Sequence, residues 1–156
     1  MRQVDARNQE ALSAEISEEF GPHGRLWIPT KKRIKKFAQR TRDFTAQHVD
    51  ATYASSLGFA DVIAHGMLIA ANLTRLRPGP GFELVGVQST FGVEFHSRFV
   101  RAVVAGEHVH GRERLSFVEY KPRRVLLTHE FEVKNADKDD ELVAKGYFIV
   151  GYYLTA

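Results

Sequence analysis

The sequence predicts a single α+β domain in which a buried helix packs against an antiparallel sheet. Two observations lead to this class. Apolar residues before position 77 recur with the helical period of about 3.6, whereas those after position 84 alternate with the strand period of about 2. One helical stretch also leaves little polar surface, which is typical of a buried helix. Since 156 residues can bury a core without disulfides or a metal, one domain is expected.

The N-terminal residues carry a helical pattern of their own. Apolar side chains recur there at four-residue steps or multiples of them: Val4, Leu12, Ile16 and Phe20. A short amphipathic helix is therefore expected, with Gly21-Pro22 as its stop. Residues 26–28, just before Pro29, are compatible with a short first strand.

Three helices are expected next. Thr30 can cap a helix over residues 31–41, and Asp50 can cap a second, shorter one. The third runs from about residue 65 to 76 and is apolar almost all round, so it should be the buried helix. The Pro- and Gly-rich residues 77–81 end it.

Four long strands are expected to follow. Apolar and polar residues alternate over 85–95 and 125–133, more weakly over 109–117, and again over 142–154. Successive strands joined by short turns, such as the polar residues 135–140, are usually antiparallel. A buried helix covered by such a sheet is an α+β layer arrangement.

Composition and charge exclude several classes of function. The absence of cysteine rules out disulfides, thiolate catalysis and Cys-ligated zinc or iron–sulfur sites. The net charge of +3 suits an anionic small molecule or partner but is too weak to argue for nucleic acid. No apolar run reaches the ~18 residues that span a bilayer, and the N-terminus lacks the apolar core of a signal peptide. We therefore expect a cytoplasmic protein without a membrane partner.

Asp43 and His48 place a carboxylate and an imidazole on one short connection between helical patterns. Loops held by a rigid scaffold often carry catalytic groups, and this pair of side chains is suited to acid–base chemistry. The Asp-x4-His spacing is common, however. A helix end at Asp43 and a surface position for His48 would explain it as well.

Gly66 stands where the buried helix begins. The first turn of a helix has unpaired N–H groups, and glycine lets a ligand approach that backbone closely. A thioester oxygen that gains negative charge during a reaction could be held there. Alternatively, Gly66 serves only to let the helix pack tightly against the sheet, with His65 as a packed structural residue.

In combination these residues form a far more specific pattern. The chain resembles the MaoC-like dehydratases, which include the (R)-specific enoyl-CoA hydratases, in Phe37-Ala-Gln-Arg-Thr-Arg-Asp43-Phe-Thr-Ala-Gln-His48-Val-Asp50, in Gly58-Phe59 and in Ile63-Ala64-His65-Gly66-Met67-Leu68. The signature of that family reads Phe-Ala, then Gly-Asp-x-Asn-Pro-x-His-x-Asp, then Gly-Phe and Ile-Ala-His-Gly-Met-Leu. The likeness extends more loosely over residues 30–152.

The resemblance implies a hotdog fold, in which a curved antiparallel sheet wraps a long central helix. Residues 30–156 would form this domain, and residues 1–29 an N-terminal extension with the possible first strand. Such proteins are usually dimeric, so a homodimer is expected, with a heterodimer as the other option. The implied substrates are acyl thioesters, with trans-2-enoyl and (R)-3-hydroxyacyl forms interconverted. No metal or cofactor is implied, because coenzyme A or a carrier-protein arm belongs to the substrate.

The resemblance also implies roles for individual residues. Asp43 and His48 match the catalytic pair that activates water and handles the proton at the α-carbon. The backbone N–H of Gly66 matches the oxyanion hole. Neighbours of that glycine in the motif are expected to contact the substrate: Ala64, His65 and Met67.

The chain departs from the family signature around Asp43. Arg42 stands in place of the glycine, and Thr45-Ala46 in place of Asn-Pro. Thr45 can supply part of the hydrogen bonding of the asparagine, whereas Ala46 loses the constraint of the proline. An arginine beside Asp43 is expected to favour the carboxylate form if it points inward. The altered turn leaves a second hypothesis open, a non-catalytic hotdog subunit that binds acyl thioesters or completes a site with a partner subunit.

Two other patterns point to metal chemistry. His48-x-Asp50 with a distant histidine is similar to the ligand set of non-haem iron oxygenases, and His108-Val-His110 to cupin-like sites. Both folds need more strands and no long buried helix. We therefore expect Asp50 to be a helix cap and both histidines to lie on a polar strand face. Candidates for binding substrate phosphates are Arg98, Arg101, Lys121, Arg123 and Arg124.

Overall fold

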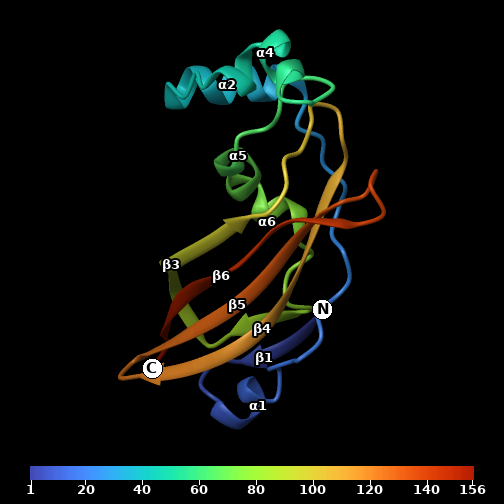
Figure 1. The fold of residues 1–156 in the computed structure, drawn as a ribbon. Coiled ribbons are helices and arrows are strands. Elements are labelled where there is room, and N and C mark those ends of the chain that lie inside the picture. The colour runs from blue at the N-terminus through green and yellow to red at the C-terminus, as the bar shows by residue number, and fades with distance from the viewer.

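In the computed structural model, which describes residues 1–156, a curved four-stranded sheet forms the body of the molecule (Figure 1). Its strands are β3 (Val87–Phe99), β4 (Val109–Lys121), β5 (Arg124–Asn135) and β6 (Glu141–Leu154). Every pairing is antiparallel, and the order is β3-β6-β5-β4. The prediction of long antiparallel strands is confirmed. The alternation of apolar and polar residues does not predict which strands pair, so it does not show that β3 pairs with β6 and not with β4.

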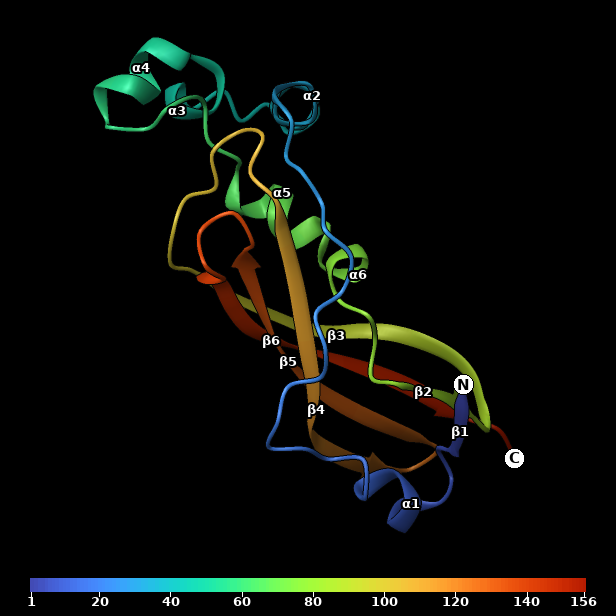
Figure 2. The same cartoon turned by 90° about the vertical axis from the view of Figure 1, so that its right-hand side faces the viewer.

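Three helices form a cluster beyond one end of the sheet, as both ribbon views show (Figures 1 and 2). They are α2 (Lys31–Thr41), α3 (Ala46–Val49) and α4 (Ala51–Ser56). The Thr30 hydroxyl accepts the backbone N–H of Arg33 at 3.3 Å, and Asp50 accepts those of Thr52 and Tyr53. Both predicted caps are confirmed, because each satisfies N–H groups that the first helical turn leaves unpaired.

The predicted buried helix is present but broken. It consists of α5 (Gly66–Ala71) and α6 (Leu73–Leu76), which step from the helical cluster down to the sheet (Figure 2). At the break, the side-chain amide of Asn72 donates to the Leu68 carbonyl at 2.8 Å, and such local bonds compete with helical geometry. The expectation of burial all round is wrong at Met67, whose side chain is 59% exposed.

The N-terminal residues do not form the predicted helix over Val4–Phe20. β1 (Arg2–Asp5) pairs in parallel with β2 (Phe82–Val85), and only α1 (Gln9–Ser13) is helical. Val4 and Leu12 are both buried, in a small core beneath the far end of the sheet. Pairing with a distant strand thus overrides the local four-residue pattern.

Residues 14–30 run beside the free edge of β4, where the chain can be followed next to that strand in Figure 2. Backbone N–H groups of Ser17, Gly21 and Gly24 donate to β4 carbonyls at 2.8–3.0 Å. The predicted strand at 26–28 is reduced to a single bridge between Trp27 and Val109. This segment covers polar edge groups that would otherwise be open to pairing with another chain.

A buried polar cluster fixes the end of α6 against the sheet. The guanidinium of Arg77 pairs with Glu113 and lies 4.5 Å from the centroid of the Phe148 ring. His129 stacks on the same Phe148 ring, with ring centroids 4.9 Å apart. Burial lowers the pKa of His129 to about 4 and raises the pKa of Glu113.

This cluster predicts a loss of stability in mild acid. His129 stays neutral in the folded protein down to about pH 4, whereas in the unfolded chain it gains a proton near its ordinary pKa of 6.5. The free energy of unfolding should therefore fall by about 3 kcal/mol between roughly pH 6.5 and 4 from this group alone. Urea unfolding of wild type and His129→Gln at several pH values checks it. The variant keeps Glu113, whose raised pKa by itself makes the folded protein more stable as the pH falls. If the free energy of unfolding depends on pH equally in both proteins, His129 is not the source of the loss.

None of the helices is long and apolar enough to cross a membrane.

Candidate active site

Arg42 makes the turn that brings Asp43 to the site. It follows the last residue of α2 and adopts the left-handed conformation, with φ 60° and ψ 24°. Glycine takes this conformation without the steric cost that a Cβ adds, which explains why the related motif has glycine at this position. Arg42 adopts the same left-handed conformation at some steric cost. The shape of the turn is therefore preserved in this chain although the glycine is absent.

Replacing Arg42 by glycine should stabilise the protein. The left-handed conformation costs a non-glycine residue about 1–2 kcal/mol, and the greater freedom of glycine in the unfolded chain returns about 0.5–1 kcal/mol of that. We expect Arg42→Gly to raise the free energy of unfolding by about 0.5–1 kcal/mol in urea denaturation. Arg40→Gly, two residues earlier and within the right-handed helix, should lower it. A loss of stability in both variants would contradict this account.

Asp43, His48 and His65 converge on one spot. One polar atom of each lies within 4.8 Å of the others. Asp43 comes from the turn after α2, His48 from α3 and His65 from the residue before α5. The structure thus brings together the two residues predicted as catalytic and adds the histidine of the second motif.

Thr45 holds the Asp43 carboxylate. Its hydroxyl donates to Asp43 Oδ1 at 2.6 Å, and its backbone N–H donates to the same atom at 3.2 Å. These two bonds lower the pKa of Asp43, with the nearby histidines as smaller contributors. The expectation that Arg42 would favour the carboxylate is wrong about the cause, because Thr45 supplies the effect. Thr45 does hydrogen-bond locally, as expected of a replacement for asparagine.

Removal of the Thr45 hydroxyl should therefore raise the pKa of Asp43 toward its ordinary value. Thr45→Val keeps the side-chain shape and the backbone N–H but lacks the donor, whereas Thr45→Ser keeps the donor. An NMR titration of the Asp43 carboxyl carbon in the three proteins measures the shift. An unchanged pKa in the valine variant would show that the hydroxyl does not hold the carboxylate.

The tautomer of His48 is fixed by its surroundings. Nδ1 lies 2.8 Å from the carbonyl oxygen of Ile63. Because a carbonyl can only accept, Nδ1 carries the proton in the neutral ring and Nε2 is left with its lone pair. His48 is thus oriented by the backbone and offers a basic nitrogen, which is the arrangement that a general base needs.

His65 is buried and packs against the two residues predicted as catalytic, Asp43 and His48. Its ring stacks on that of His48 with centroids 3.9 Å apart, and its Nε2 lies 3.1 Å from the backbone carbonyl of Asp43. Burial lowers the pKa of His65, which favours the neutral ring. These contacts fit a residue that positions the Asp43 turn and the His48 ring. Its predicted contact with substrate stays a prediction.

Gly66 opens α5 directly beside this cluster. As the first residue of the helix it has no intrahelical acceptor for its N–H. A Cβ at this position would lie 2.9 Å from the ring of Phe99, so glycine is required by close packing as well as leaving the backbone open. The two alternatives for Gly66, tight packing and an exposed N–H, are therefore compatible.

A hollow of about 300 Å³, here called the inner hollow, is lined by both His48 and Gly66. Most of its remaining wall is apolar: Ile63, Ala64, Ile69, Phe99, Val103 and Val143. On the other side, His48 also lines an outer hollow of about 360 Å³ together with Phe44 and Val49. His48 thus lies between the inner and the outer hollow. The inner hollow is large and apolar enough for an acyl chain.

The other predicted residues are distributed unevenly around the site. Ala64 lines the inner hollow, whereas the exposed Met67 does not line either hollow. Of the five basic candidates, Arg101 lines the inner hollow, where it pairs with Glu141. Lys121 and Arg124 end the strands of the β4–β5 hairpin, at the end of the sheet opposite to the helical cluster (Figure 1).

Comparison with known proteins places this chain in a family. The family model described as "MaoC like domain" matches residues 4–134. The chain belongs to the MaoC-like family. It is 30% identical over 137 residues to nodulation protein N of Rhizobium meliloti (strain 1021), covering 81% of each protein.

Solved structures of MaoC-like proteins share the fold. The (R)-hydratase from A. caviae involved in PHA biosynthesis superimposes with a TM-score of 0.67 at 20% identity, covering 86% of this chain and 96% of that one. The ChsH1-ChsH2 complex from Mycobacterium tuberculosis gives a TM-score of 0.75 at 16% identity, covering 95% and 96%. The α+β hotdog fold expected from the resemblance is thereby confirmed, with its central helix broken at Asn72 in this MaoC-like chain.

Three features of the MaoC-like site were missed by sequence reasoning. They are the Ile63 carbonyl that orients His48, the Phe99 ring against Gly66 and the stacking of His65 on His48. Phe99 lies at the end of β3, more than 30 positions from Gly66, and no local pattern links the two. The Asp50 side chain caps α4, as expected, and is not part of the converging cluster that contains His48.

Proposed function

We propose that this MaoC-like protein interconverts trans-2-enoyl and (R)-3-hydroxyacyl thioesters. The observation that carries the proposal is the geometry at His48. Its Nε2 is free, the Asp43 carboxylate is within 4.8 Å of the cluster, and both stand beside a hollow lined by the Gly66 backbone. This is an acid–base pair next to an unpaired hydrogen-bond donor, the equipment for adding water to an activated double bond.

In the hydration direction, Asp43 and His48 hold a water molecule between them. His48 Nε2 accepts one proton from the water as its oxygen forms a bond to C3 of the enoyl thioester. The electron pair of the double bond moves toward the thioester carbonyl, and the resulting enolate oxygen is held by the Gly66 N–H. A proton returned by one of the pair to C2 completes the addition. The reaction itself requires neither a metal nor a redox cofactor.

The surroundings support a thioester on coenzyme A or a carrier protein. The inner hollow supplies apolar walls for the acyl chain, and Arg101 lies at that hollow. Lys31 and Lys35 line the outer hollow, with Lys31 paired to Asp61 at 2.5 Å. These cations are suited to the phosphates of either carrier.

Hydration of a panel of enoyl-CoAs, beginning with crotonyl-CoA, tests the proposal. Loss of the conjugated-thioester absorbance reports turnover, and longer and branched chains map the inner hollow. We expect turnover on at least one chain length by the purified protein. Absence of turnover across the panel, together with absence on matching carrier-protein thioesters, would contradict the proposal.

The exposed apolar side chains around the site favour assembly with a second subunit. Phe44, Met67 and Phe99 are 56%, 59% and 43% exposed. Exposed apolar surface on a soluble protein often marks an interaction site, and we propose that a second copy covers these side chains. Multi-angle light scattering of the purified protein should give a dimer.

A non-catalytic subunit is the second candidate function. The same exposed side chains would then meet a different MaoC-like subunit, which would complete the site. Binding of acyl-CoA without turnover by the pure protein, and turnover after cell extract is added, would favour this candidate. Turnover by the pure protein would exclude it.

A further inference from the structure

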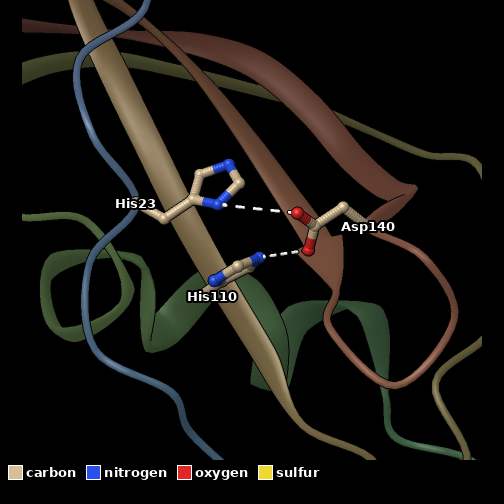
Figure 3. A group of neighbouring side chains, drawn as sticks. All are labelled: His23, His110 and Asp140. Atoms are coloured by element: carbon tan, nitrogen blue, oxygen red, sulfur yellow. Dashed lines mark hydrogen bonds and ion pairs between the residues drawn. The ribbon is translucent and has the colours of Figure 1, made fainter.

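A second convergence of polar side chains lies away from the candidate active site, at the covered edge of the sheet (Figure 3). His23 comes from the segment that runs beside β4, His110 from β4 itself, and Asp140 from the turn between β5 and β6. One ligand-capable atom of each lies within 4.8 Å of the others. We propose that His23, His110 and Asp140 bind a zinc ion that fastens the N-terminal segment to the sheet.

The distances are those of a site close to coordination geometry. His110 Nε2 lies 2.6 Å from Asp140 Oδ1, and His23 Nδ1 lies 3.8 Å from Asp140 Oδ2. With bonds of about 2.0–2.2 Å to a tetrahedral zinc ion, ligand atoms would stand roughly 3.4 Å apart. The two observed separations, which are measured to different oxygens of the Asp140 carboxylate, lie on either side of this value. A small opening of the His110–Asp140 contact and a small closing of the His23–Asp140 contact would admit the ion.

The chemistry of the three side chains favours zinc over magnesium and calcium. Two imidazoles and one carboxylate suit zinc and neighbouring transition metals, whereas magnesium and calcium prefer oxygen ligands alone. The Asp140 side chain is 45% exposed, which leaves the site open to an entering ion and to water as a fourth ligand.

The positively charged side chains near the site do not prevent a cation from binding there. Arg112 and Lys134 are the positive groups that act on His23. Arg112 is paired with Glu132 at 2.7 Å, and Lys134 lies 3.9 Å from the same carboxylate. Their charge is therefore partly offset before an ion arrives.

Backbone contacts hold the three side chains next to one another. The backbone N–H of Gly24 donates to the Gly111 carbonyl at 2.8 Å, which places His23 beside His110, with ring centroids 3.9 Å apart. In Figure 3 both rings face the Asp140 carboxylate from the same side of the hairpin. A metal bound here would join three separate segments of the chain and hold the covered edge of β4 closed.

Zinc titration of the full-length protein, purified without a histidine tag, tests the proposal. Isothermal calorimetry with zinc chloride should give one ion per chain. Changing a residue that only supports a metal ligand costs about 10–100-fold in affinity, so His23→Gln and His110→Gln, which remove ligands, should weaken binding by at least tenfold. Zinc should also slow amide hydrogen exchange over residues 14–30 in the wild type and not in His110→Gln.

Two further variants separate this site from the other histidine clusters. His108→Gln removes a histidine two positions before His110, in the loop that precedes β4, which pairs with Asp137 at 3.0 Å and lies outside the three-ligand set. His48→Gln alters the cluster at the candidate active site. Both should bind zinc as the wild type does. The proposal is overturned if the wild type binds no stoichiometric zinc, if His110→Gln binds it equally well, or if His48→Gln abolishes binding.

Discussion

Replacing His48 by alanine, or Asp43 by asparagine, should lower the rate of enoyl-thioester hydration by roughly 10²–10⁴-fold, the usual contribution of a positioned acid or base. The alanine variant lacks the free Nε2 of His48, the atom that accepts the proton of the attacking water in the proposed mechanism. In the asparagine variant the carboxylate held by Thr45 is replaced by a neutral amide. Rates measured with crotonyl-CoA, or with the best substrate of the panel, check both.

The fold should survive these changes, since Asp43 is exposed and His48 is only half-buried. Matched controls are available in the chain. Asp50→Asn changes a neighbouring carboxylate that only caps α4, and asparagine is an equally good cap. His108→Ala changes a histidine that pairs with Asp137 and lies outside the Asp43–His48–His65 cluster. Both should keep wild-type rates, and near-wild-type rates in the His48 and Asp43 variants with unchanged thermal melting would remove those residues from the mechanism.

Gly66→Pro should lower the hydration rate by roughly 10²–10³-fold, the cost of removing one oxyanion-hole donor. Proline has no backbone N–H, but it is well tolerated at the first position of a helix, which Gly66 occupies. The preceding residue also fits, because His65 has ψ 137°, within the range that a residue before proline adopts. The change therefore deletes the proposed donor while leaving α5 able to form.

The matched control is Gly66→Ala. Its Cβ meets the Phe99 ring at 2.9 Å as the proline ring would, but the alanine variant keeps the N–H. We expect the alanine variant to lose much less activity than the proline variant. Equal losses in both would show that crowding against Phe99, and not the N–H, accounts for the requirement for glycine.

Much of the scaffold could be predicted from local signals. Thr30 and Asp50 cap helices at the expected positions because capping depends on residues only two or three positions apart. The long strands follow from alternation for the same reason. The pairing of β3 with β6, the parallel pairing of β1 with β2 and the segment beside β4 all depend on distant partners, which no local pattern contains.

The features of the candidate site can also be divided into those that the local sequence predicts and those that depend on distant residues. Asp43 and His48 are close in sequence and were expected to act as a pair, and the structure brings them together with His65. The sequence could not show that Ile63 orients the His48 ring, or that Phe99 crowds Gly66. Arg42 was noted as a departure from the motif. Its left-handed backbone shows that the turn is kept although the glycine is not.

Chiral analysis of the 3-hydroxybutyryl-CoA formed from crotonyl-CoA tests the central claim most directly, with wild type and His48→Ala measured side by side. Water held by Asp43 and His48 on one face of the bound double bond predicts a single enantiomer from the wild type and almost none from the variant, and the proposed reaction requires that enantiomer to be (R). Formation of the (S) enantiomer or of a racemate, or an equal yield from the variant, would contradict the proposed chemistry of this site.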